Sequence, residues 1–367
     1  MGDKALGFIA VHVGAGYHSQ QNISQYEIVC NMACQKACAS LQLGQNALEA
    51  LTVAIKVLEN SPLTNAGIGS NLTMNGEVEC DASIMDGSSS SFGAVAAVSG
   101  IKNPIVVSKK LLQLQSTSRS FGQVPPMILC GEGAHDWAIK HGILGISPKS
   151  MISEASMKAF RRYSSYLNNE GGTKMFKIDH EDECVMDTVG GVCLDSNGYI
   201  CAGVSSGGIL MKYPGRIGQA AIYGSGCWAS NAIKNSPIAC SSSGCGEELI
   251  KTSLCKECWQ LCTTSKTDGV SILQELLKKK FIESPFLCEN DDKQAGIILL
   301  KSRFNKEPEK QSLEIDFSWG HTTRSMAVGC MAVTDRMPQF FVSRLKKEKS
   351  GGSLIHTQSI VKQFSLA

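Results

Sequence analysis

The chain has 367 residues, of which 43% are hydrophobic, and a formal net charge of +2. This length predicts roughly one to three domains, and the near-balanced charge argues against a surface built for nucleic acid or for an anionic membrane. No run of eighteen apolar residues occurs, so we predict no transmembrane helix.

The N-terminal half is predicted to alternate strands, helices and glycine turns. An apolar stretch at 6–13 leads into Gly14-Ala15-Gly16 without a basic leader or a cleavage site, which favours a buried first strand over a secretion signal and predicts an intracellular protein. Further along we expect helices at 22–43 and 45–60, strands at 77–85 and 92–99, and a strand at 127–130 before a helix that ends near 142.

Polar residues of mixed charge fill the segment from 143 to 184. An irregular segment of this length inside a compact protein is typically functional or disordered. We therefore expect a flexible leash over about 143–187, which ends at Asp187-Thr188.

A β-hairpin is predicted directly after Thr188. Its strands cover 188–194 and 199–205, and Asn197-Gly198 is a typical hairpin turn. The remaining predicted elements are a loop at 206–218, a strand at 237–242, helices at 244–262 and 270–283, strands at 293–301, 313–318, 323–334 and 340–342, and a loose tail over 347–367. Sheets in both halves with helices between them predict an α+β protein, one domain over 1–367, built as a four-layer α-β-β-α sandwich.

Asp187-Thr188 stands where the polar segment changes abruptly into an apolar strand. If the bond before Thr188 breaks, this one residue carries a hydroxyl nucleophile and an α-amine that can act as its base. That is the chemistry of an N-terminal-nucleophile hydrolase. The dipeptide is common by chance, so the surrounding motifs must support it.

Two side chains beyond the hairpin are candidates for the same site. The hairpin would bring Ser206 beside Thr188, where its hydroxyl could hydrogen-bond to the threonine, although a serine here also suits a simple turn. Arg216 follows Pro214-Gly215, and its guanidinium can bind a carboxylate through two parallel bonds. It is a candidate anchor for a substrate aspartate, and a surface position is the alternative.

The serine run before Gly244 predicts the start of a helix, because Ser241, Ser242 and Ser243 are followed by acidic residues. Free amides at a helix N-terminus can stabilise an oxyanion. An ordinary helix cap is the alternative interpretation.

Other patterns are interpreted as structural. No P-loop motif occurs, and the histidines form no metal or triad motif. We assign turn or strand roles to the four nearby carboxylates Glu77, Glu79, Asp81 and Asp86. The sixteen cysteines include two stripes of helical spacing, Cys30, Cys34 and Cys38, and Cys255, Cys258 and Cys262. A zinc or redox site is one reading of these stripes, but without a partner motif at finger spacing we favour buried reduced thiols and predict no metal site.

Taken together, the motifs resemble the plant-type (type 2) asparaginase family of N-terminal-nucleophile hydrolases. The matching stretches occur in a fixed order: His12–Gly16, Asn65–Ser70, Asp81–Gly87, Thr188–Gly190, Ser205–Gly208, Pro214–Arg216 and Ser243–Gly246. The resemblance covers roughly residues 7–340. The ordered series is specific, whereas each single motif is not.

The resemblance implies a role for each matching residue. Thr188 and Ser206 would form the catalytic pair. Thr188 would be the nucleophile, and its freed α-amine would be the base. Ser206 would be the hydroxyl partner of Thr188. Substrate would be bound by Arg216 at its carboxylate, by Ser243 and Gly244 at its oxyanion, and beside the nucleophile by the loop of Asn65.

Two departures point to the members of the family that cut proteins after aspartate. Asparaginases typically have glycine before the nucleophile, whereas this chain has Asp187 there. They also have an aspartate that binds the substrate's α-amine, and this chain has Gln219 at that position. An endopeptidase substrate presents a neutral amide nitrogen there, so the resemblance implies an endopeptidase with Gln219 in its substrate site. An amidase of free asparagine would lose a charge-assisted contact worth about 1.5–3 kcal/mol.

The resemblance also implies assembly and partners. The chain would split into an α subunit 1–187 and a β subunit 188–367, assembled as a dimer of heterodimers (α2β2). Substrates would be nuclear regulators such as trithorax-type histone methyltransferases and a general transcription factor subunit, which places the protein in nucleus and cytoplasm. Arg161-Arg162 and Lys346-Lys347 are too short for a convincing import signal. The only cofactor implied is a structural sodium ion bound by carbonyls of 58–68.

Three alternatives stay open. An L-asparaginase or isoaspartyl dipeptidase would release ammonia from asparagine or split isoaspartyl dipeptides. A scaffold that never matures would bind partners through 143–187. A cysteine-based metal protein would purify with stoichiometric zinc.

Overall fold

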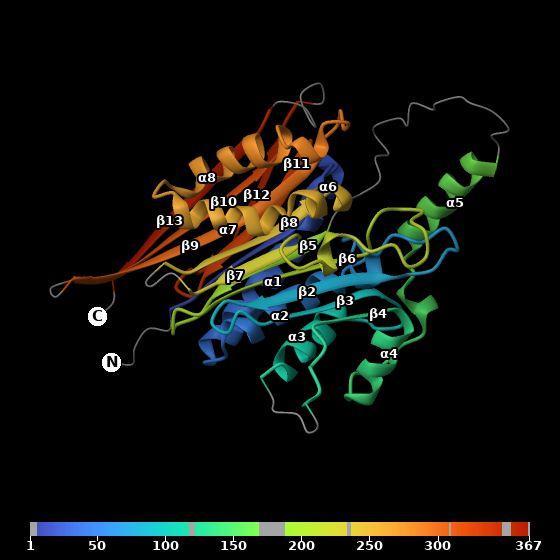
Figure 1. The fold of residues 1–367 in the computed structure, drawn as a ribbon, viewed down its shortest axis with the longest axis horizontal. Helices are drawn as coiled ribbons and strands as arrows, with labels where there is room; N and C mark the ends of the chain where they lie inside the picture. The colour runs from blue at the N-terminus through green and yellow to red at the C-terminus, as the bar shows by residue number, and fades with distance from the viewer. Residues whose placement is uncertain are drawn as a thin grey trace.

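The computed structural model describes residues 6–116, 122–168, 188–232, 236–307, 310–346 and 354–365. The larger of its two sheets has eight strands, in the order β12 (Gln339–Arg344), β11 (Ser325–Ala332), β1 (Phe8–Gly16), β5 (Val189–Leu194), β6 (Ile200–Ser206), β2 (Cys80–Asp86), β3 (Phe92–Val98) and β4 (Ile128–Cys130) (Figure 1). The smaller sheet has five, in the order β13 (His356–Ser365), β10 (Lys310–His321), β9 (Ala295–Glu307), β8 (Ile238–Gly244) and β7 (Cys227–Ser230). Within these sheets all neighbours are antiparallel except β3 and β4.

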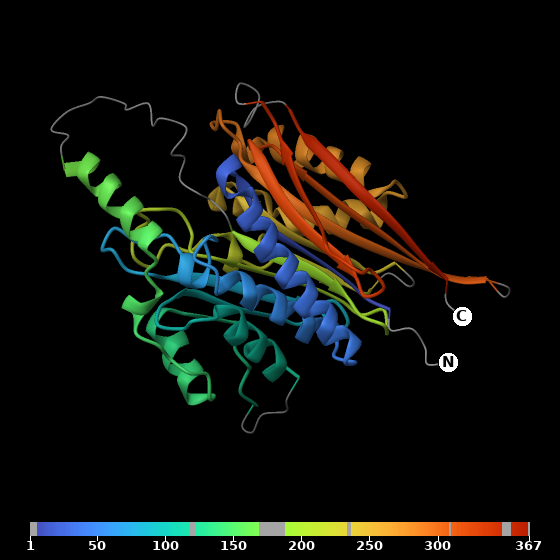
Figure 2. The same ribbon diagram turned by 180° about the vertical axis from the view of Figure 1, so that it is seen from behind.

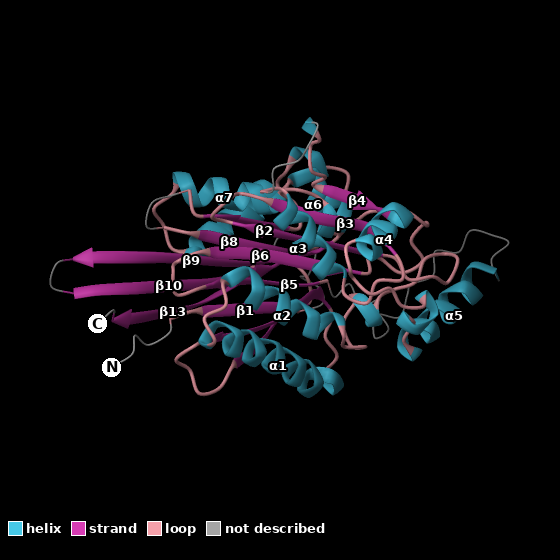
Figure 3. Ribbon diagram, turned by 90° about the horizontal axis from the view of Figure 1, so that it is seen from below, coloured by secondary structure: helices cyan, strands magenta, loops and turns pink. Residues whose placement is uncertain are grey.

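Helices lie on the outer faces of the two sheets. The larger sheet is covered by α1 (Ile23–Gln42), α2 (Ala47–Glu59) and α3 (Pro104–Leu114), and α4 (Gly131–Lys140) packs against β3 and β4; Figures 2 and 3 show α1 and α2 running across the sheet. The smaller sheet is covered by α7 (Leu254–Thr264) and α8 (Gly269–Glu275), the latter continuing as a π-helix over Leu276–Ile282, and α6 (Gly246–Thr252) follows β8 (Figure 1). The prediction of a chain with sheets and helices in both halves is confirmed.

The two sheets pack face to face around a shared apolar core. Side chains of β5 and β6, such as Val192 and Val204, belong to the same buried cluster as Ala239 and Leu299 of the smaller sheet. Burial of this apolar area is the main force that holds the sheets together. Any side chain on the inner face of β5 therefore lies between the sheets.

The hairpin after Thr188 forms as predicted, and its turn fixes its register. Asp195 closes the turn by accepting the Gly198 N–H at its carbonyl (3.0 Å) and the Asn197 N–H at its carboxylate (2.9 Å). Gly198 has a φ of 79°, a conformation that glycine adopts without strain. The resulting register pairs Val189 with Ser205, so the residue before β5 lies beside the last residue of β6.

The expectation of an irregular segment from residue 143 is wrong for its first part. Residues Pro148–Met151 form a 3-10 turn and Glu154–Asn168 form the helix α5, both within the predicted leash and after α4 (Gly131–Lys140). Met157 and Phe160 pack against the cluster that contains Leu72 and Val78, which explains why a helix rich in serine and charge is stable. Residues 169–187, including Asp187, lie outside the described residues.

The expectation of a loose C-terminal tail over 347–367 is wrong for residues 354–365; the remainder of that range lies outside the described residues. Residues 356–365 form β13, which pairs with β10 from His321↔His356 to Ser312↔Ser365. Ile360 and Phe364 pack against the main core. Tertiary pairing with a long neighbouring strand, rather than local pattern, decides this segment.

Two further differences concern the region after residue 226. Strand β7 was not predicted, and the helix expected at 244–262 is divided into α6 and α7 at Ser253, whose φ of 47° and ψ of 46° break the helix. Ser241, Ser242 and Ser243 lie buried inside β8 and do not cap a helix; Cys245 occupies the N-cap position of α6.

The cysteine stripes lie in the core. Cys30, Cys34 and Cys38 are buried on α1, and Cys255, Cys258 and Cys262 are buried on α7. Across the described ranges, no group of three or more His, Cys, Asp or Glu side chains is arranged to hold a metal ion. No helix among the described residues is long and apolar enough to cross a membrane.

Candidate active site

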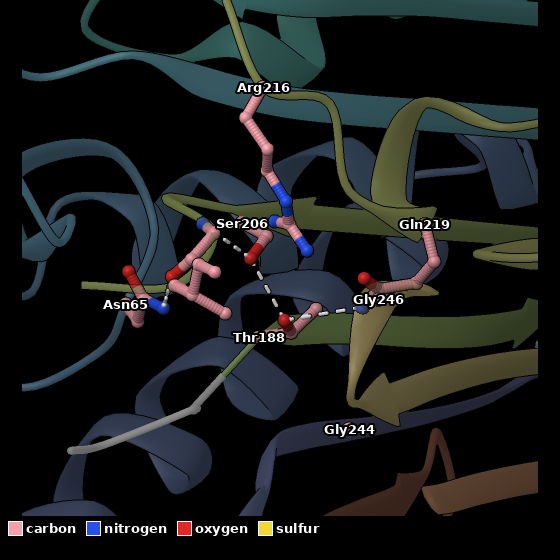
Figure 4. Close-up of a pocket in the computed structure, with 9 residues that line it drawn as sticks. Asn65, Thr188, Ser206, Arg216, Gln219, Gly244 and Gly246 are labelled. Carbon is pink, nitrogen blue, oxygen red and sulfur yellow. Dashed lines mark hydrogen bonds between the residues drawn. The ribbon is translucent and has the colours of Figure 1, made fainter. Parts of the chain in front are cut away.

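A pocket lies at the ends of β5, β6 and β8 (Figure 4). Its lining residues are Asn65, Thr188, Ser206, Gly208, Ile209, Arg216, Gln219, Gly244 and Gly246. Six of the residues singled out in the sequence thus meet in one place: Thr188, Ser206, Arg216, Gln219, Gly244 and Asn65. Ser243 is absent from the lining, and Asp187 lies outside the described residues.

Thr188 and Ser206 are in direct contact. The Thr188 Oγ1 lies 2.9 Å from the Ser206 Oγ, and both side chains are almost fully buried. The Ser206 Oγ also accepts the Gly208 N–H at 3.0 Å. Because that oxygen already accepts one bond, its own proton is free to be donated to Thr188.

Gln219 also reaches the threonine. Its Nε2 donates to the Thr188 Oγ1 at 3.4 Å, and its side chain is buried (Figure 4). The amide is neutral at every pH, so this position adds a hydrogen-bonding group to the pocket without adding charge.

Arg216 points into the pocket, and one edge of its guanidinium is already occupied. Its Nε and Nη2 donate to the Glu247 carboxylate at 2.8 and 2.6 Å. Burial opposes the ionisation of Glu247, but the hydrogen bond and charge of Arg216 outweigh it, so the pKa of Glu247 is lowered. Glu247, which stands on the first turn of α6, was not predicted as a partner of Arg216.

Three glycines surround the guanidinium of Arg216. A Cβ built on Gly208 would lie 3.1 Å from Nη1, one on Gly218 would lie 2.9 Å from it, and one on Gly246 would lie 2.7 Å from Nη2. Side chains at these positions would displace the guanidinium, so the glycines keep its pocket side open.

The loop that carries Arg216 and Gln219 is held by two carboxylates. Asp81 accepts the Gly218 N–H at 2.7 Å and the Ala97 N–H at 2.8 Å, and Glu79 accepts the Gly215 N–H at 2.8 Å. Burial raises the pKa of Asp81. Both residues were assigned structural roles from the sequence, and their structural role is to fix this loop.

Asn65 braces the turn after β6. Its Nδ2 donates to the Gly208 carbonyl at 2.7 Å, its Oδ1 accepts the Asn71 N–H at 2.9 Å, and its carbonyl accepts the Gly207 N–H at 2.8 Å. These bonds hold the chain that follows Ser206, so they fix the Gly208 N–H that contacts the serine.

Of Ser243 and Gly244, which were predicted to bind the oxyanion together, only Gly244 lines the pocket. Gly244, with a φ of 139°, lines the pocket at the end of β8, where a Cβ would collide with the Gln294 main chain. The Ser243 Oγ instead accepts the Ala15 N–H at 3.0 Å and is fully buried. Strand alternation turns the serine towards β1, away from the pocket.

Glu59 supports β6 from the opposite face and was not noticed in the sequence. Its Oε1 accepts the Ser205 Oγ–H at 2.7 Å and the Ile105 N–H at 3.0 Å, while Oε2 has no partner among the described residues. Burial raises the pKa of this carboxyl to about 7. Ser205 is the neighbour of Ser206, so Glu59 helps to place the strand end.

Comparison with known proteins identifies the family. The model of the asparaginase family matches residues 5–281. The isoaspartyl peptidase of Escherichia coli (strain K12) is 33% identical over 252 residues, which are 66% of this chain and 73% of that protein. The plant-type L-asparaginase of Thermococcus kodakarensis is 35% identical over 257 residues, 68% of this chain and 78% of that protein.

A mammalian relative is similar over a shorter stretch. The isoaspartyl peptidase/L-asparaginase of Bos taurus is 36% identical over 218 residues, which are 59% of this chain and 63% of that protein. The family resemblance read from the ordered motifs is thereby confirmed. The chain belongs to the plant-type asparaginase family, whose members are N-terminal-nucleophile hydrolases.

Proposed function

We propose that this protein is a self-processing threonine endopeptidase of the threonine aspartase (taspase) type, with the four-layer α-β-β-α fold of N-terminal-nucleophile hydrolases. It would cut its own chain between Asp187 and Thr188 and then cut other proteins after aspartate. The single observation that carries this proposal over an amidase is the neutral Gln219, which contacts the Thr188 hydroxyl where an asparaginase would need an anion for the substrate's α-amine.

Self-cleavage would begin with attack of the Thr188 Oγ1 on the carbonyl carbon of Asp187. The Oγ1 proton passes to the nitrogen as the C–N bond breaks, so the nitrogen becomes the α-amine of Thr188. Water then hydrolyses the ester, which leaves a carboxylate on Asp187 and restores the Thr188 hydroxyl. Ser206 supports the attack because its Oγ, 2.9 Å from the Thr188 Oγ1, can relay the proton that this oxygen gives up. Gln219 donates a hydrogen bond to the same threonine oxygen.

The mature enzyme would use the same oxygen on a substrate. The α-amine of Thr188 takes the hydroxyl proton as the Oγ1 attacks the main-chain carbonyl of a substrate aspartate, and then gives it to the leaving amine. An unperturbed α-amine has a pKa of about 7.7–8.0, which suits a base at neutral pH. Water then hydrolyses the acyl ester and releases the new C-terminus.

Arg216 would select aspartate at the cleavage site. Glu247 holds the Nε and Nη2 side of its guanidinium, and Nη1 lies between Gly208 and Gly218 at the pocket. A guanidinium has five N–H donors, so it can bind a substrate carboxylate while it stays paired to Glu247. The pair orients the guanidinium before substrate arrives, which reduces the entropy that binding costs.

The experiment that tests the proposal compares three substrates. Purified protein is incubated with a peptide that contains one internal aspartate, with the same peptide carrying asparagine at that place, and with free asparagine. We expect cleavage after aspartate only, and no ammonia. Ammonia from free asparagine with the aspartate peptide intact would overturn the endopeptidase assignment.

The second candidate is an asparaginase or isoaspartyl peptidase, and the names of the similar proteins favour it. A β-linked aspartyl dipeptide added to the same experiment tests it. Its hydrolysis at a rate above that of the aspartate peptide would make this candidate the better one.

The assembly of the protein and its cofactor are also proposals, and they rest on the family resemblance. We expect an α2β2 dimer of heterodimers, which native mass spectrometry would resolve, and substrates among nuclear regulatory proteins. A structural sodium ion at 58–68 would use main-chain oxygens. Those of Leu58 and Ser61 do not fit this role, because each already accepts two hydrogen bonds: the Thr64 hydroxyl at 2.7 and 3.2 Å, and the N–H of Ser61 at 3.1 Å and of Thr64 at 3.5 Å, respectively. No step of the reaction uses it.

A further inference from the structure

Lys212 is a buried lysine in the loop that leads from β6 to Arg216. Only 2% of the residue is exposed, and its carbonyl is held by the Met74 N–H at 2.9 Å. Its Nζ donates to the main-chain carbonyl of Glu79 at 2.7 Å, which is its one acceptor among the residues that the structure describes. An ammonium group has three N–H donors, so two of them stay without a partner. Because a buried charge is costly unless it is hydrogen-bonded, this side chain needs a further acceptor.

Gly208 separates Lys212 from Arg216 and lines the pocket. A Cβ at residue 208 would lie 3.1 Å from the Arg216 Nη1 and 3.4 Å from the Lys212 Nζ, and the nearest heavy atoms around it all belong to these two side chains. Both cationic nitrogens therefore border the place that a side chain at 208 would fill. An acceptor that enters this place from the pocket can reach both of them.

Gly208 itself cannot supply that acceptor. Its carbonyl already accepts the Nδ2 of Asn65 at 2.7 Å and of Asn71 at 2.9 Å, and its N–H is donated to the Ser206 Oγ at 3.0 Å. A carbonyl oxygen has two lone pairs, so both are in use. These three bonds also fix the glycine, which keeps the place between the two cations open.

The carboxylates around this place are bonded elsewhere. Asp81 accepts two main-chain N–H groups, the Glu79 side chain accepts the Gly215 N–H, and Glu247 accepts the Nε and Nη2 of Arg216. None of these carboxylates bonds to the Lys212 Nζ or to the Arg216 Nη1 in the described part of the chain. The charges of Lys212 and Arg216 do act on Asp81 at longer range, where they oppose the rise in its pKa that burial causes.

We propose that Lys212 is a specificity-determining residue that binds the side-chain carboxylate of the substrate aspartate together with Arg216, at the place left empty by Gly208. This inference rests on the proposed function. An ionised carboxylate has two oxygens and accepts only, so it can take bonds from Nη1 and Nζ at once. An asparagine side chain has one oxygen, and its NH₂ group would face a cationic donor. The two cations together therefore select aspartate over asparagine.

Lys212→Gln tests the charge, because it keeps an N–H donor on a slightly shorter side chain. We expect KM for the aspartate peptide to rise about tenfold or more, the effect of losing one charge-assisted hydrogen bond, while kcat changes less. Lys301→Gln is the matched control. The Lys301 Nζ also donates to a main-chain carbonyl, that of Thr267 at 2.8 Å, but Lys301 pairs with Ile238, at the opposite end of β8 from Gly244. Its KM should stay within about twofold of wild type.

Inhibition by product-like peptides separates selection from mere loop support. Two peptides that differ only in a C-terminal aspartate or asparagine are compared as competitive inhibitors. The preference of wild type for the aspartate peptide should fall about tenfold or more in Lys212→Gln. An unchanged preference, or an equal loss of affinity for both peptides, would overturn the inference with the endopeptidase intact, because a lysine that only holds the loop through Glu79 weakens both alike. Wild-type protein that neither splits nor cuts the aspartate peptide would overturn the proposed function, and the inference with it.

If Lys212→Gln does not fold, selective ¹⁵N-lysine NMR on wild-type protein replaces it. Lys212→Arg, which keeps the charge, identifies the Nζ resonance of Lys212 by its loss. We expect this resonance to shift when the peptide ending in aspartate is added and to shift far less with the peptide ending in asparagine. A resonance that the aspartate peptide leaves unchanged would overturn the inference.

Discussion

Ser206 places its Oγ 2.9 Å from the Thr188 Oγ1 while it accepts the N–H of Gly208 at 3.0 Å. The second bond uses one lone pair of the serine oxygen, so the serine hydroxyl can still donate to the threonine oxygen or accept from it. The pair depends on the register of the β5–β6 hairpin and on Asn65, which holds the turn at Gly208.

Ser206→Ala should lower self-cleavage and peptide turnover by about 10- to 1,000-fold, in the range that removal of one positioned donor costs. Ser205→Ala is the matched control, because the neighbouring serine bonds to Glu59 on the opposite face of β6. It should lower the melting temperature and leave turnover within a few fold. Equal losses of turnover in the two variants would remove any special role for Ser206.

Arg216→Lys should raise KM for the aspartate peptide about tenfold or more with a smaller change in kcat. A lysine ammonium is a point charge that cannot bind Glu247 and a substrate carboxylate through paired bonds. The melting temperature should change little, because the Glu247 side chain is half exposed and such ion pairs contribute about 0–1 kcal/mol. Steady-state kinetics separates the two constants, and an unchanged KM would contradict the anchor role.

Gln219→Asp should shift the enzyme towards small substrates with a free α-amine. The new carboxylate would bind an ammonium group in a buried place, a contact worth about 1.5–3 kcal/mol, or roughly 10- to 150-fold in relative specificity. Gln219→Glu controls for charge with a longer side chain. The ratio of ammonia release from asparagine to peptide cleavage measures the shift, and a constant ratio would argue against Gln219 as the selecting residue.

Stability should fall on the acidic side of neutrality because of buried histidines. Burial lowers the pKa of His18 to about 4 and of His321 to about 3, from an ordinary value of 6.5. Protons therefore bind the unfolded chain more tightly, so stability is complete above about pH 6.5 and is lost as pH falls towards 4. Melting temperatures recorded from pH 5 to 7 test this, and a flat profile would contradict it.

The contribution of Glu59 to stability should decrease as the pH rises, which is opposite to the effect of the histidines. Its pKa is raised by burial from 4.5 to about 7, so its contribution is complete below about pH 4.5 and is lost as pH rises through about 7. Glu59→Gln keeps a hydrogen-bond acceptor without the charge, and its melting temperature should decline less than that of wild type between pH 6 and 9. Parallel profiles would show that Glu59 is not the titrating group.

Local pattern was enough for the parts of the site that are close in sequence. Asn197-Gly198 fixes a short hairpin, and from that turn alone Ser206 could be placed beside Thr188. The meeting of Arg216, Gln219, Gly244 and Asn65 needed the family resemblance, since these residues come from separate loops and strands.

The residues that the sequence did not reveal act over long separations. Glu247 pairs with Arg216 from the next helix, Glu59 bonds to Ser205 across 146 positions, and His12 bonds to Ser241 across 229. A lone glutamate or histidine carries no local signal of such a partner. The helix α5 and the strand β13 were missed for a related reason, because packing on Leu72 and Val78 and pairing with β10 decide them.

The most direct test of the central claim is the intact mass of purified wild-type and Thr188→Ala protein after incubation at neutral pH. We predict two fragments in wild type, residues 1–187 and 188–367, and one undivided chain in the variant. A wild-type chain that stays whole, or a variant that splits at the same bond, would contradict Thr188 as the nucleophile of this hydrolase.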